Sequence, residues 1–356
     1  MSSRPGTVLH VVPSAPFGGA QRVAIDLAMT QRARGRDATL LGTRPGERFE
    51  AAARESDVPV ATLPHGLRHR IAGLRVAARR ADIVHLHLWA PWYPLALRGQ
   101  GRIATHLHSG PSLGVHGIGL RTLMQSASDR RVLNQSARVV AISDWIAAEW
   151  RGNGLSARTP CDTVLNGIYI PAPRLPPTKP GTTIGVASRL ARLKGLEELI
   201  DAMGALRAAG RGDIRLRIAG EGPERAALEA RAAGLPISFV GHVSDMDRFW
   251  ADTDLSVFTA PREPFGLRLI EPVARGIPVV AYRNGTGSDE VIALCRGVAA
   301  VPYGDSAALA REIIDILETP ARYGRMAREG RQDCETHFSC EAMADSVDAV
   351  YAKILA

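Results

Sequence analysis

Apolar residues along this chain follow two different spacings that replace one another from segment to segment. Short continuous apolar runs, which predict buried strands, are separated by segments with the 3.6-residue period of amphipathic helices. In the first half the predicted strands are Thr7–Val12, Ala38–Gly42, Val58–Leu63, Ile83–Leu88, Ile103–His108 and Ala137–Ile142. The clearest helical patterns there are Ala20–Ala33 and Gly117–Leu133. Such alternation predicts a parallel sheet with helices on both faces.

The alternation stops at residues 168–183 and then resumes. This window is rich in proline, which is poorly tolerated inside helices and central strands, so it is predicted to be an extended linker. The strands predicted after it are Thr182–Ala187, Ile214–Ala219, Ile237–Val240, Leu255–Phe258 and Ile277–Ala281. The predicted helices are Gly195–Ala208, Pro223–Ala233, Leu267–Arg275, Ser306–Leu317, Ala321–Thr336 and Cys340–Leu355.

We therefore expect an α/β protein with two Rossmann-like, doubly wound domains, a number that suits 356 residues. Residues 1–167 would form the first domain and 184–337 the second, joined by the linker at 168–183. The last helix, at 338–356, is expected to return to the first domain. Open parallel sheets bind ligands at the carboxyl ends of their strands, so two such domains facing each other would form a deep cleft.

Composition and charge are those of a globular protein with a basic first half. Hydrophobic residues make up 46% and charged residues 22%, which excludes wholesale disorder. The net charge is +8, and residues 1–165 hold 21 arginines and 11 acidic residues, so they carry +10 and the remainder −2. This field favours an anionic partner, such as a lipid surface, a phosphate-bearing acceptor or nucleic acid. An arginine-rich solvated surface is an equally good explanation.

Cysteine spacing and hydropathy indicate where the protein works. The cysteines show no C-x-x-C spacing and no nearby histidine cluster, which argues against a zinc site and is typical of reduced thiols in a cytoplasm. The apolar run near the N-terminus is too short for a signal peptide, and no stretch reaches the ~20 apolar residues of a spanning helix. We expect a cytoplasmic protein that contacts a membrane at most peripherally.

Residues 261–282 contain the clearest candidate ligand site. Glu263 and Glu271 lie eight residues apart and enclose Phe265 and Gly266, at the start of a helical pattern. Glycine lets the backbone approach a ligand closely, and the N-terminus of the following helix favours a phosphate. The two glutamates could accept hydrogen bonds from sugar or ribose hydroxyls. The spacing alone also fits one surface glutamate and one in a first helical turn.

Two other strand-to-helix loops could contribute to binding. Arg189 and Lys194 lie five residues apart, where both could reach one diphosphate, although exposed basic pairs are common. Gly18 and Gly19 separate the first strand from the first helix. They could let a substrate sit on the helix end, or they could form an ordinary tight turn.

Two tempting motifs are given structural interpretations. Residues 218–225, IAGEGPER, lack the third glycine of a dinucleotide fingerprint, and Pro223 is more typical of the first residue of a helix. The D-x-D triplets at 245–247 and 252–254 resemble metal–nucleotide ligands. Their positions beside predicted strands indicate helix caps and turns instead. No metal site is therefore predicted.

In combination, the motifs resemble the retaining glycosyltransferases of the GT-B fold, specifically the family 4 group. The donor-binding signature of that family is matched by Glu263, Phe265, Gly266, Glu271, Gly276, Pro278, Val279 and Val280. Further matches, in the same order along the chain, are Gly18-Gly19, Asn166-Gly167-Ile168, Arg189 with Lys194, Gly220-x-Gly222-Pro223 and Phe338-Ser339. The resemblance covers nearly the whole chain, and the motifs are jointly specific.

The resemblance implies a role for each cation at the donor site. Arg189 and Lys194 would neutralise the donor diphosphate, assisted by the backbone amides of Gly266 and Leu267. Arg268 is an additional cation beside this phosphate position and could be a third phosphate contact.

It also implies roles for two glutamates and one histidine. Glu263 would contact hydroxyls of the donor sugar, and Glu271 would hold the ribose. His108 occupies the place of a family histidine at the end of an N-domain strand, close to the transferred sugar. The remaining histidines on neighbouring strands are expected to be core or supporting residues, namely His85, His87 and His106.

The sequence departs from the family pattern at three of these motifs. Ser188 replaces the first glycine of the loop that contains Arg189 and Lys194. Tyr169 replaces the aspartate that usually follows Asn-Gly-Ile, and Pro272 follows Glu271 where the family usually has alanine. A proline deeper than the first turn would remove a helical hydrogen bond. This predicts a helix that begins late, near Leu269.

The resemblance implies transfer of a hexose-type sugar from a UDP- or GDP-sugar, with retention and without a metal ion or another cofactor.

Basic and apolar residues alternate at 67–80 and again at 116–124, a pattern that favours an anionic membrane surface and a lipid-linked acceptor of polysaccharide or cell-envelope assembly. A solvated helix and a soluble acceptor are the alternative. A sugar-nucleotide epimerase of the same fold and a catalytically silent nucleotide-sugar-binding partner also remain open. A nucleic-acid partner is not expected.

Overall fold

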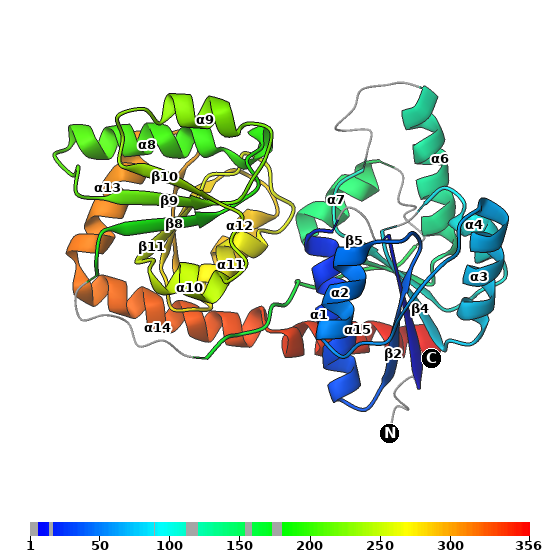
Figure 1. The fold of residues 1–356 in the computed structure, drawn as a ribbon. Helices are drawn as coiled ribbons and strands as arrows, with labels where there is room; N and C mark the ends of the chain where they lie inside the picture. The colour runs from blue at the N-terminus through cyan, green and yellow to red at the C-terminus, as the bar shows by residue number, and fades with distance from the viewer. Residues whose placement is uncertain (1–5, 14–16, 89, 112–119, 154–158, 173–179) are drawn as a thin grey trace. The chain divides into compact units, whose positions relative to one another are not determined.

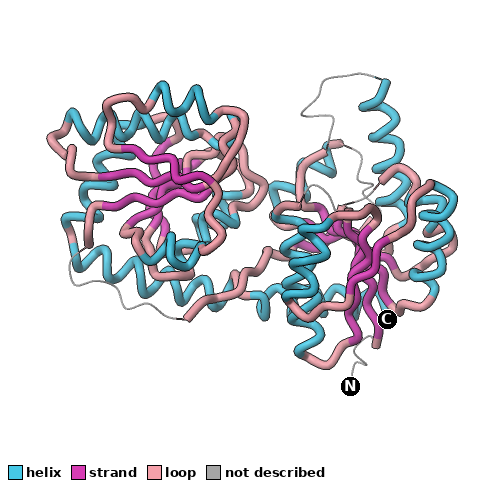
Figure 2. The backbone as a smooth tube through the Cα atoms, viewed as in Figure 1, coloured by secondary structure: helices cyan, strands magenta, loops and turns pink. Residues whose placement is uncertain are grey.

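The computed structural model describes residues 6–13, 17–88, 90–111, 120–153, 159–172 and 180–356. The chain forms two compact units (Figure 1). Unit 1 comprises Met1–Tyr169 and Ser339–Ala356, and unit 2 comprises Ile170–Phe338. Each unit contains one sheet of parallel strands with helices packed around it (Figure 2). Both sheets confirm the predicted fold class of two Rossmann-like, doubly wound domains.

The sheet of unit 1 has the order β3-β2-β1-β4-β5-β6-β7, so strand order reverses between β1 and β4. Its strands are β1 (Thr7–Val12), β2 (Asp37–Gly42), β3 (Val60–Thr62), β4 (Ile83–His87), β5 (Ile103–Leu107), β6 (Arg138–Ala141) and β7 (Cys161–Thr163). The edge strand β7 was not predicted, because three residues with little apolar character give no strand pattern. The central strands β4 and β5 are completely buried, as their continuous apolar runs indicate.

The helices of unit 1 follow the strands in regular alternation. They are α1 (Gly19–Ala33), α2 (Glu47–Glu55), α3 (Leu67–Arg79), α4 (Tyr93–Ala96), α6 (Leu120–Gln135), α7 (Asp144–Gly152) and α15 (Cys340–Leu355). The helix predicted at 117–133 corresponds to α6, and its first three residues lie outside the described part of the chain.

The C-terminal helix α15 belongs to unit 1. The side chain of Ser339 caps its N-terminus by accepting a hydrogen bond from the Ala342 backbone. Arg36, which is almost fully buried, forms an ion pair with Asp348 of α15 at 2.8 Å. The hydroxyl of Tyr351, also buried, lies 2.6 Å from Nδ1 of His85 on β4. These contacts fix the last helix on the sheet of unit 1.

Unit 2 contains a six-stranded sheet of order β10-β9-β8-β11-β12-β13, which reverses between β8 and β11. Its strands are β8 (Thr183–Ala187), β9 (Arg215–Ala219), β10 (Ile237–Gly241), β11 (Leu255–Phe258), β12 (Val279–Arg283) and β13 (Val298–Pro302). The helical elements are η1 (Arg192–Lys194), α8 (Leu196–Ala208), α9 (Arg225–Arg231), α10 (Met246–Ala251), α11 (Leu267–Val273), α12 (Ser288–Leu294), α13 (Ser306–Glu318) and α14 (Pro320–His337).

Two predicted helix boundaries in unit 2 are wrong. Helix α9 begins at Arg225, and Pro223 lies in the preceding turn. Helix α11 begins at Leu267 and not near Leu269, with Pro272 inside it. Pro272 is the sixth residue of α11, and the helix ends one residue later. The missing N–H therefore affects only the last turn of a short helix, which explains why the helix start is not delayed.

The D-x-D triplets have the structural roles predicted for them. The side chain of Asp245 caps α10 by accepting a hydrogen bond from the backbone of Arg248. Asp254 accepts a hydrogen bond at 3.0 Å from the backbone N–H of Thr183, at the start of β8.

Candidate functional site

The candidate site lies at the carboxyl edge of the unit 2 sheet. The loop after β8 contains Ser188, Arg189 and Lys194, and the loop after β11 contains Glu263 and leads into α11. Because β8 and β11 flank the point where strand order reverses, their loops diverge there and leave room for a ligand.

Glycines allow the loop after β8 to pack against neighbouring backbone. Gly195 has a φ of 63°, and a Cβ atom there would lie 2.0 Å from the carbonyl oxygen of Thr259. Gly220, with a φ of 130°, would place a Cβ 2.0 Å from the carbonyl oxygen of Ser188. Neither approach is possible with a side chain. The glycines of the turn after β9 thus serve close packing against this loop, which agrees with rejecting a dinucleotide fingerprint.

Glu263 joins the two loops through ion pairs. Its Oε2 atom accepts hydrogen bonds from Lys194 Nζ at 3.1 Å and from the guanidinium of Arg268 at 3.2 Å. Arg268 also donates to Ser188 Oγ at 2.7 Å and lies 5.2 Å from the centre of the Phe258 ring. One carboxylate and two cations from three segments therefore form a single network.

The loop after β12 holds the backbone of Glu263 in place. Thr286 Oγ1 accepts a hydrogen bond from the Glu263 N–H at 3.2 Å and lies 3.1 Å from its carbonyl oxygen. The side-chain oxygen of Asn284 accepts a hydrogen bond from Thr286 Oγ1 at 2.6 Å. The side-chain nitrogen of Asn284 donates to the carbonyl oxygen of Ala260 at 2.7 Å. The sequence interpretation missed both of these side chains. Their position directly after a buried strand could have identified them, because Glu263 follows β11 in the same way.

The network has an excess of positive charge. Burial lowers the pKa of Lys194, and repulsion from Arg268 and Arg189 adds to this effect, whereas Glu263 opposes it. Arg189 is exposed and close enough to Lys194 to contribute to that repulsion. Three cations around one carboxylate leave a net positive charge, which suits an anion with several oxygen atoms.

The remaining predicted residues of unit 2 lie on α11. Gly266 caps this helix with a φ of 103°, and Leu267 is its first residue. Glu271 lies one turn beyond Leu267 and is half-buried. The structure thus brings Arg189, Lys194, Glu263 and Arg268 together, with the amides of Gly266 and Leu267 on the helix that carries Arg268.

The predicted residues of unit 1 lie at the carboxyl edge of its own sheet. Gly18 and Gly19 are exposed and follow β1 at the start of α1. The N–H of Gly18 donates to Oε1 of Gln21 at 3.1 Å, which closes the turn. His108 comes directly after β5 and is half-buried.

Four histidines lie beneath His108, on β1, β4 and β5, and form one cluster with it. His10, His85, His87 and His106 are fully buried, which confirms a core position for the three that the sequence analysis assigned there. Burial lowers the pKa of His10 to about 4 and that of His108 to about 3. Within the described residues, ring nitrogens of two trios come within 4.8 Å of one another: His10, His85 and His87, and His87, His106 and His108.

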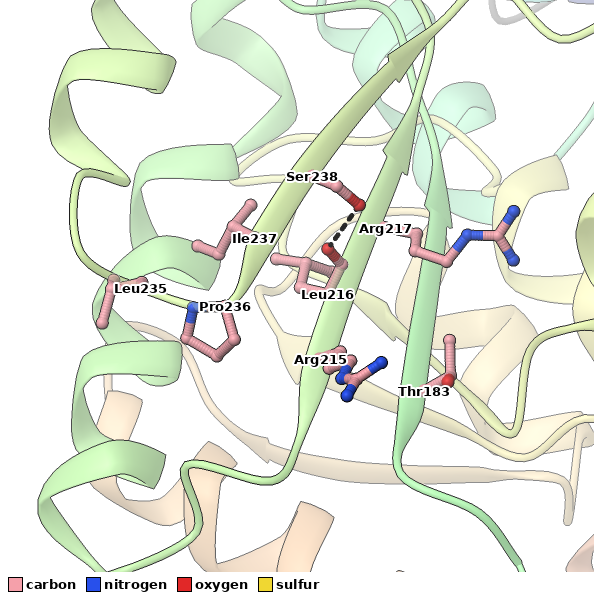
Figure 3. A pocket seen from close by; sticks show the side chains of 8 residues that line it. All are labelled: Thr183, Arg215, Leu216, Arg217, Leu235, Pro236, Ile237 and Ser238. Carbon is pink, nitrogen blue, oxygen red and sulfur yellow. Dashed lines mark hydrogen bonds between the residues drawn. The ribbon is translucent and has the colours of Figure 1, made fainter.

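A surface pocket on unit 2 is not a good alternative site. Its lining is made up of the first residues of β8, β9 and β10, with Leu235 and Pro236 (Figure 3). These are the amino ends of parallel strands, at the edge opposite to Glu263. One of its two arginines, Arg217, lies 3.7 Å from Asp252 and 5.1 Å from the centre of the Phe249 ring.

Among the residues that the structure describes, none of the helices combines the length and apolar character needed to cross a bilayer.

Family models match both halves of the chain. Residues 17–170 match the model described as Glycosyltransferase Family 4, and residues 173–333 match that described as Glycosyl transferases group 1.

Three curated relatives illustrate the range of similarity. A GDP-mannose-dependent alpha-(1-6)-phosphatidylinositol dimannoside mannosyltransferase of Mycobacterium tuberculosis is 38% identical over 151 residues, which cover 42% of this chain and only 39% of that relative. A glycogen synthase of Mycobacterium tuberculosis is 28% identical over 95% of this chain and 92% of its own length. A 2-deoxystreptamine glucosyltransferase of Streptomyces kanamyceticus is 32% identical over 50% of this chain and 47% of its own length.

Solved structures with the same fold include Anabaena Alr3699/HepE in complex with UDP and glucose. It has a TM-score of 0.78 and 20% identity, and the match covers 96% of this chain and 98% of that one. WaaG, a glycosyltransferase involved in lipopolysaccharide biosynthesis, has a TM-score of 0.72 and 18% identity, with 96% and 99% covered. Similarity at these identities establishes the fold.

Proposed function

The chain belongs to the GT-B glycosyltransferases of the family 4 type, and on this basis we propose that it transfers a hexose-type sugar from a UDP- or GDP-sugar to an acceptor, with retention of the anomeric configuration. The observation that carries this proposal is the network of Lys194, Arg268 and Glu263 at the switch point of unit 2. It combines a carboxylate that can accept hydrogen bonds from sugar hydroxyls with cations that can bind a diphosphate. The HepE complexes, which contain UDP, glucose or UDP-glucose, support the donor class.

Each residue of the network has a role in this proposal. Arg189 and Lys194 bind the donor diphosphate, and the amides of Gly266 and Leu267 assist them. Arg268, already held by Ser188 Oγ, adds a third cation. The cations carry the charge that develops on the departing nucleoside diphosphate, a stabilisation that is strong where water is excluded.

The carboxylates and the histidine select the sugar and the nucleoside. Glu263 accepts hydrogen bonds from hydroxyls of the donor sugar, and Glu271 from the ribose. His108 contacts the transferred sugar. Gly18 and Gly19 belong to the substrate-binding edge of unit 1. The acceptor hydroxyl attacks from the face that the nucleotide leaves, because the residues of the network offer no carboxylate that is free of ion pairs to act as a nucleophile.

We also propose that the enzyme needs no metal ion. In this proposal the fixed cations take over the charge neutralisation that a divalent ion provides in other transferases. The D-x-D carboxylates are engaged as a helix cap and at a strand start, which removes the obvious protein ligands for a metal–nucleotide complex.

The acceptor proposal rests on α3 and the charge of unit 1. Two apolar side chains of this helix are exposed, Leu67 (55%) and Val76 (51%). Four arginines on and directly after the helix are exposed as well, namely Arg68, Arg75, Arg79 and Arg80. Leu74, an apolar residue of the run at 67–80, is instead fully buried in the core, where it packs with residues of β4 and α4. Of the second basic run, at 116–124, residues 116–119 lie outside the described residues.

We propose that α3 binds an anionic membrane from the cytoplasmic side and that the acceptor is lipid-linked, as in polysaccharide or cell-envelope assembly. The mannosyltransferase relative, whose name includes phosphatidylinositol dimannoside, supports an acceptor of this kind. A soluble acceptor is the competing proposal, and the aminocyclitol named in the 2-deoxystreptamine glucosyltransferase supports it.

The test is release of free UDP or GDP from a set of nucleotide sugars, measured with and without candidate acceptors. Release that depends on an acceptor supports a transferase. Conversion of the donor sugar without nucleotide release would indicate an epimerase. Nucleotide-sugar binding without turnover under any condition would indicate a catalytically silent binding partner.

A further inference from the structure

The buried histidines of unit 1 lie on neighbouring strands in register. His10 on β1 is paired with His85 on β4, and His87 is paired with His106 on β5. His85 and His87 are two residues apart, as are His106 and His108, so each pair projects to one face of the sheet. These strands include the point where the sheet reverses its order, so the cluster leads to the carboxyl edge where unit 1 would bind a ligand.

Three of these rings and one amide form a continuous chain of hydrogen bonds. Gln31 Oε1, from α1, lies 2.8 Å from Nε2 of His10. Nδ1 of His10 lies 3.0 Å from Nε2 of His87, and Nδ1 of His87 lies 3.1 Å from Nε2 of His108. His10 and His87 each bond to one neighbour through Nε2 and to the other through Nδ1. Because a neutral ring has one donor and one acceptor nitrogen, the direction of one hydrogen bond fixes the direction of the next.

The amide of Gln31 sets that direction. An amide oxygen can only accept, so the proton of neutral His10 must be on Nε2, which leaves Nδ1 as an acceptor. His87 then donates from Nε2 and accepts at Nδ1, and His108 donates from Nε2. The lowered pKa of each ring agrees with the neutral form that this argument requires.

The surroundings of Gln31 favour this orientation of the amide. Its Nε2 atom makes no hydrogen bond of normal geometry but lies on the side of Tyr351, where it opposes the rise in the Tyr351 pKa that burial causes. The Tyr351 hydroxyl in turn lies 2.6 Å from Nδ1 of His85. With the amide reversed, an oxygen would face the Tyr351 oxygen, and the Tyr351 proton could bond to it only if His85 carried its own proton on Nδ1 and donated to Tyr351.

We propose that Gln31, His10 and His87 are positioning residues that hold His108 with its proton on Nε2 and its lone pair on Nδ1. His108 can then accept a hydrogen bond from a hydroxyl of the transferred sugar but cannot donate one from Nδ1. This consequence for catalysis rests on the proposed function. The tautomer itself does not, because it follows from hydrogen bonds within unit 1.

A shared metal ion is the competing use of the same nitrogens. His10, His85 and His87 come close enough for one, but His10 Nδ1 and His87 Nε2 are already joined to each other. A metal would need a lone pair from both atoms and would break the chain to His108. Metal binding and the proposed tautomer therefore exclude each other at His87.

The direct test is ¹⁵N NMR of the complete, uniformly labelled protein without ligand, using two-bond ¹⁵N–¹H correlations of the imidazole rings. His108→Asn assigns the His108 signals by their loss. The proposal predicts a protonated Nε2 and an unprotonated Nδ1 on His108. The opposite tautomer would overturn it, and so would stoichiometric zinc in the purified protein by elemental analysis.

Variants of Gln31 test the origin of the tautomer. Gln31→Leu removes the acceptor, so His108 should show averaged nitrogen signals, and turnover should fall at least ~10-fold because a histidine in the wrong tautomer loses its role. Gln31→Glu retains an acceptor and should restore the single tautomer and most of the turnover. Gln135→Leu is the matched control, since Gln135 donates to Pro94 O, away from the cluster.

The outcomes distinguish a failure of the proposed positioning role from a failure of the proposed transferase function. An unchanged His108 tautomer in folded Gln31→Leu overturns the positioning role. If Gln31→Leu does not fold, the tautomer of the native protein and the result for Gln31→Glu still decide. A protein with the predicted tautomer but no transferase activity would contradict the proposed function and leave the chain of hydrogen bonds intact.

Discussion

Lys194 Nζ lies 3.1 Å from Glu263 Oε2, so a cation that follows β8 and a carboxylate that follows β11 meet across the switch point of unit 2. Both side chains are largely buried, with 25% and 16% of their surface exposed. A partly desolvated ion pair is costly to form unless it serves a purpose. Here it would hold both groups in position until the donor binds.

The cations should be essential for turnover. We expect Arg189→Ala or Lys194→Ala to reduce turnover at least ~100-fold, because each would remove a group that is proposed to stabilise the departing diphosphate. Thermal unfolding should change little, since Glu263 keeps Arg268 as a partner. Arg192→Ala, in the same loop and exposed, is the control and should retain activity. Near-normal turnover in both active-site variants would contradict the assignment.

Activity should survive excess EDTA. The expected reason is that fixed cations and backbone amides neutralise the leaving group, so chelation removes nothing that the reaction needs. The measurement is nucleotide release before and after chelation and dialysis. Loss of activity that Mg²⁺ or Mn²⁺ restores would show that a metal ion takes part in the reaction.

The protein should bind anionic liposomes at low salt and release them at high salt. Each basic residue near such a surface contributes about 1 kcal/mol, so replacing Arg75, Arg79 and Arg80 by Glu should lower partitioning at least ~100-fold. The measurement is co-sedimentation. Replacing Arg311, Arg325 and Arg328 of unit 2 by Glu makes the same change in net charge and should have little effect. An enzyme that ignores these liposomes at low salt would favour a soluble acceptor.

Acid should destabilise the protein through its buried histidines. The folded-state pKa of His10 is about 4, below the usual histidine pKa of 6.5, so between these values the unfolded chain binds more protons and stability falls as pH falls. One such shift corresponds to about 3 kcal/mol. The pKa of Asp26, raised by burial, acts in the opposite direction.

The measurement is urea unfolding across that range of pH. His10→Asn should reduce the slope of the free energy of unfolding against pH, whereas exposed His65→Asn should not. A free energy of unfolding that stays constant from neutral pH down to about pH 5 would show that the histidines are not buried in their neutral form.

Gly220 should tolerate no side chain. A Cβ atom there would meet the carbonyl oxygen of Ser188, and its φ of 130° is strained for other residues. Gly220→Ala should therefore destabilise the protein by at least ~1–2 kcal/mol and lower turnover by displacing the loop that carries Arg189. Gly204→Ala, in α8 with open space around it, should instead stabilise by up to ~1 kcal/mol. Thermal unfolding of both variants compares the two sites.

The sequence determined the fold class and most of the elements, because these depend on local periodicity. Continuous apolar runs predicted the buried central strands, and alternation with helices predicted parallel sheets. The pattern missed β7 and β13, whose residues are mostly half-exposed or exposed and whose strands form by pairing with a neighbour across the sheet. It also misplaced the starts of α9 and α11. Pro223 lies in the turn before α9 and Pro272 in the last turn of α11, so neither proline sets the start of its helix.

The sequence also placed Arg189, Lys194 and Glu263 in loops after strands and Arg268 at the start of a helix, but it did not join the carboxylate and the cations into one network. Pairing of specific side chains depends on which loops the sheet order brings together, and here β8 and β11 are neighbours although they are far apart in sequence. For the same reason the supporting residues Ser188 and Thr286 were not predicted.

The histidines of unit 1 show most clearly what could not be predicted from the sequence alone. In the sequence they fall on three separate strands, singly at His10 and as His-x-His pairs at 85–87 and 106–108, and each could be no more than a core residue. Only strand register places His10 beside His85, and only the packing of α1 brings Gln31 to the end of the chain of hydrogen bonds. A one-residue change in register would turn these side chains to the other face, so the direction of the chain toward His108 is decided by tertiary structure.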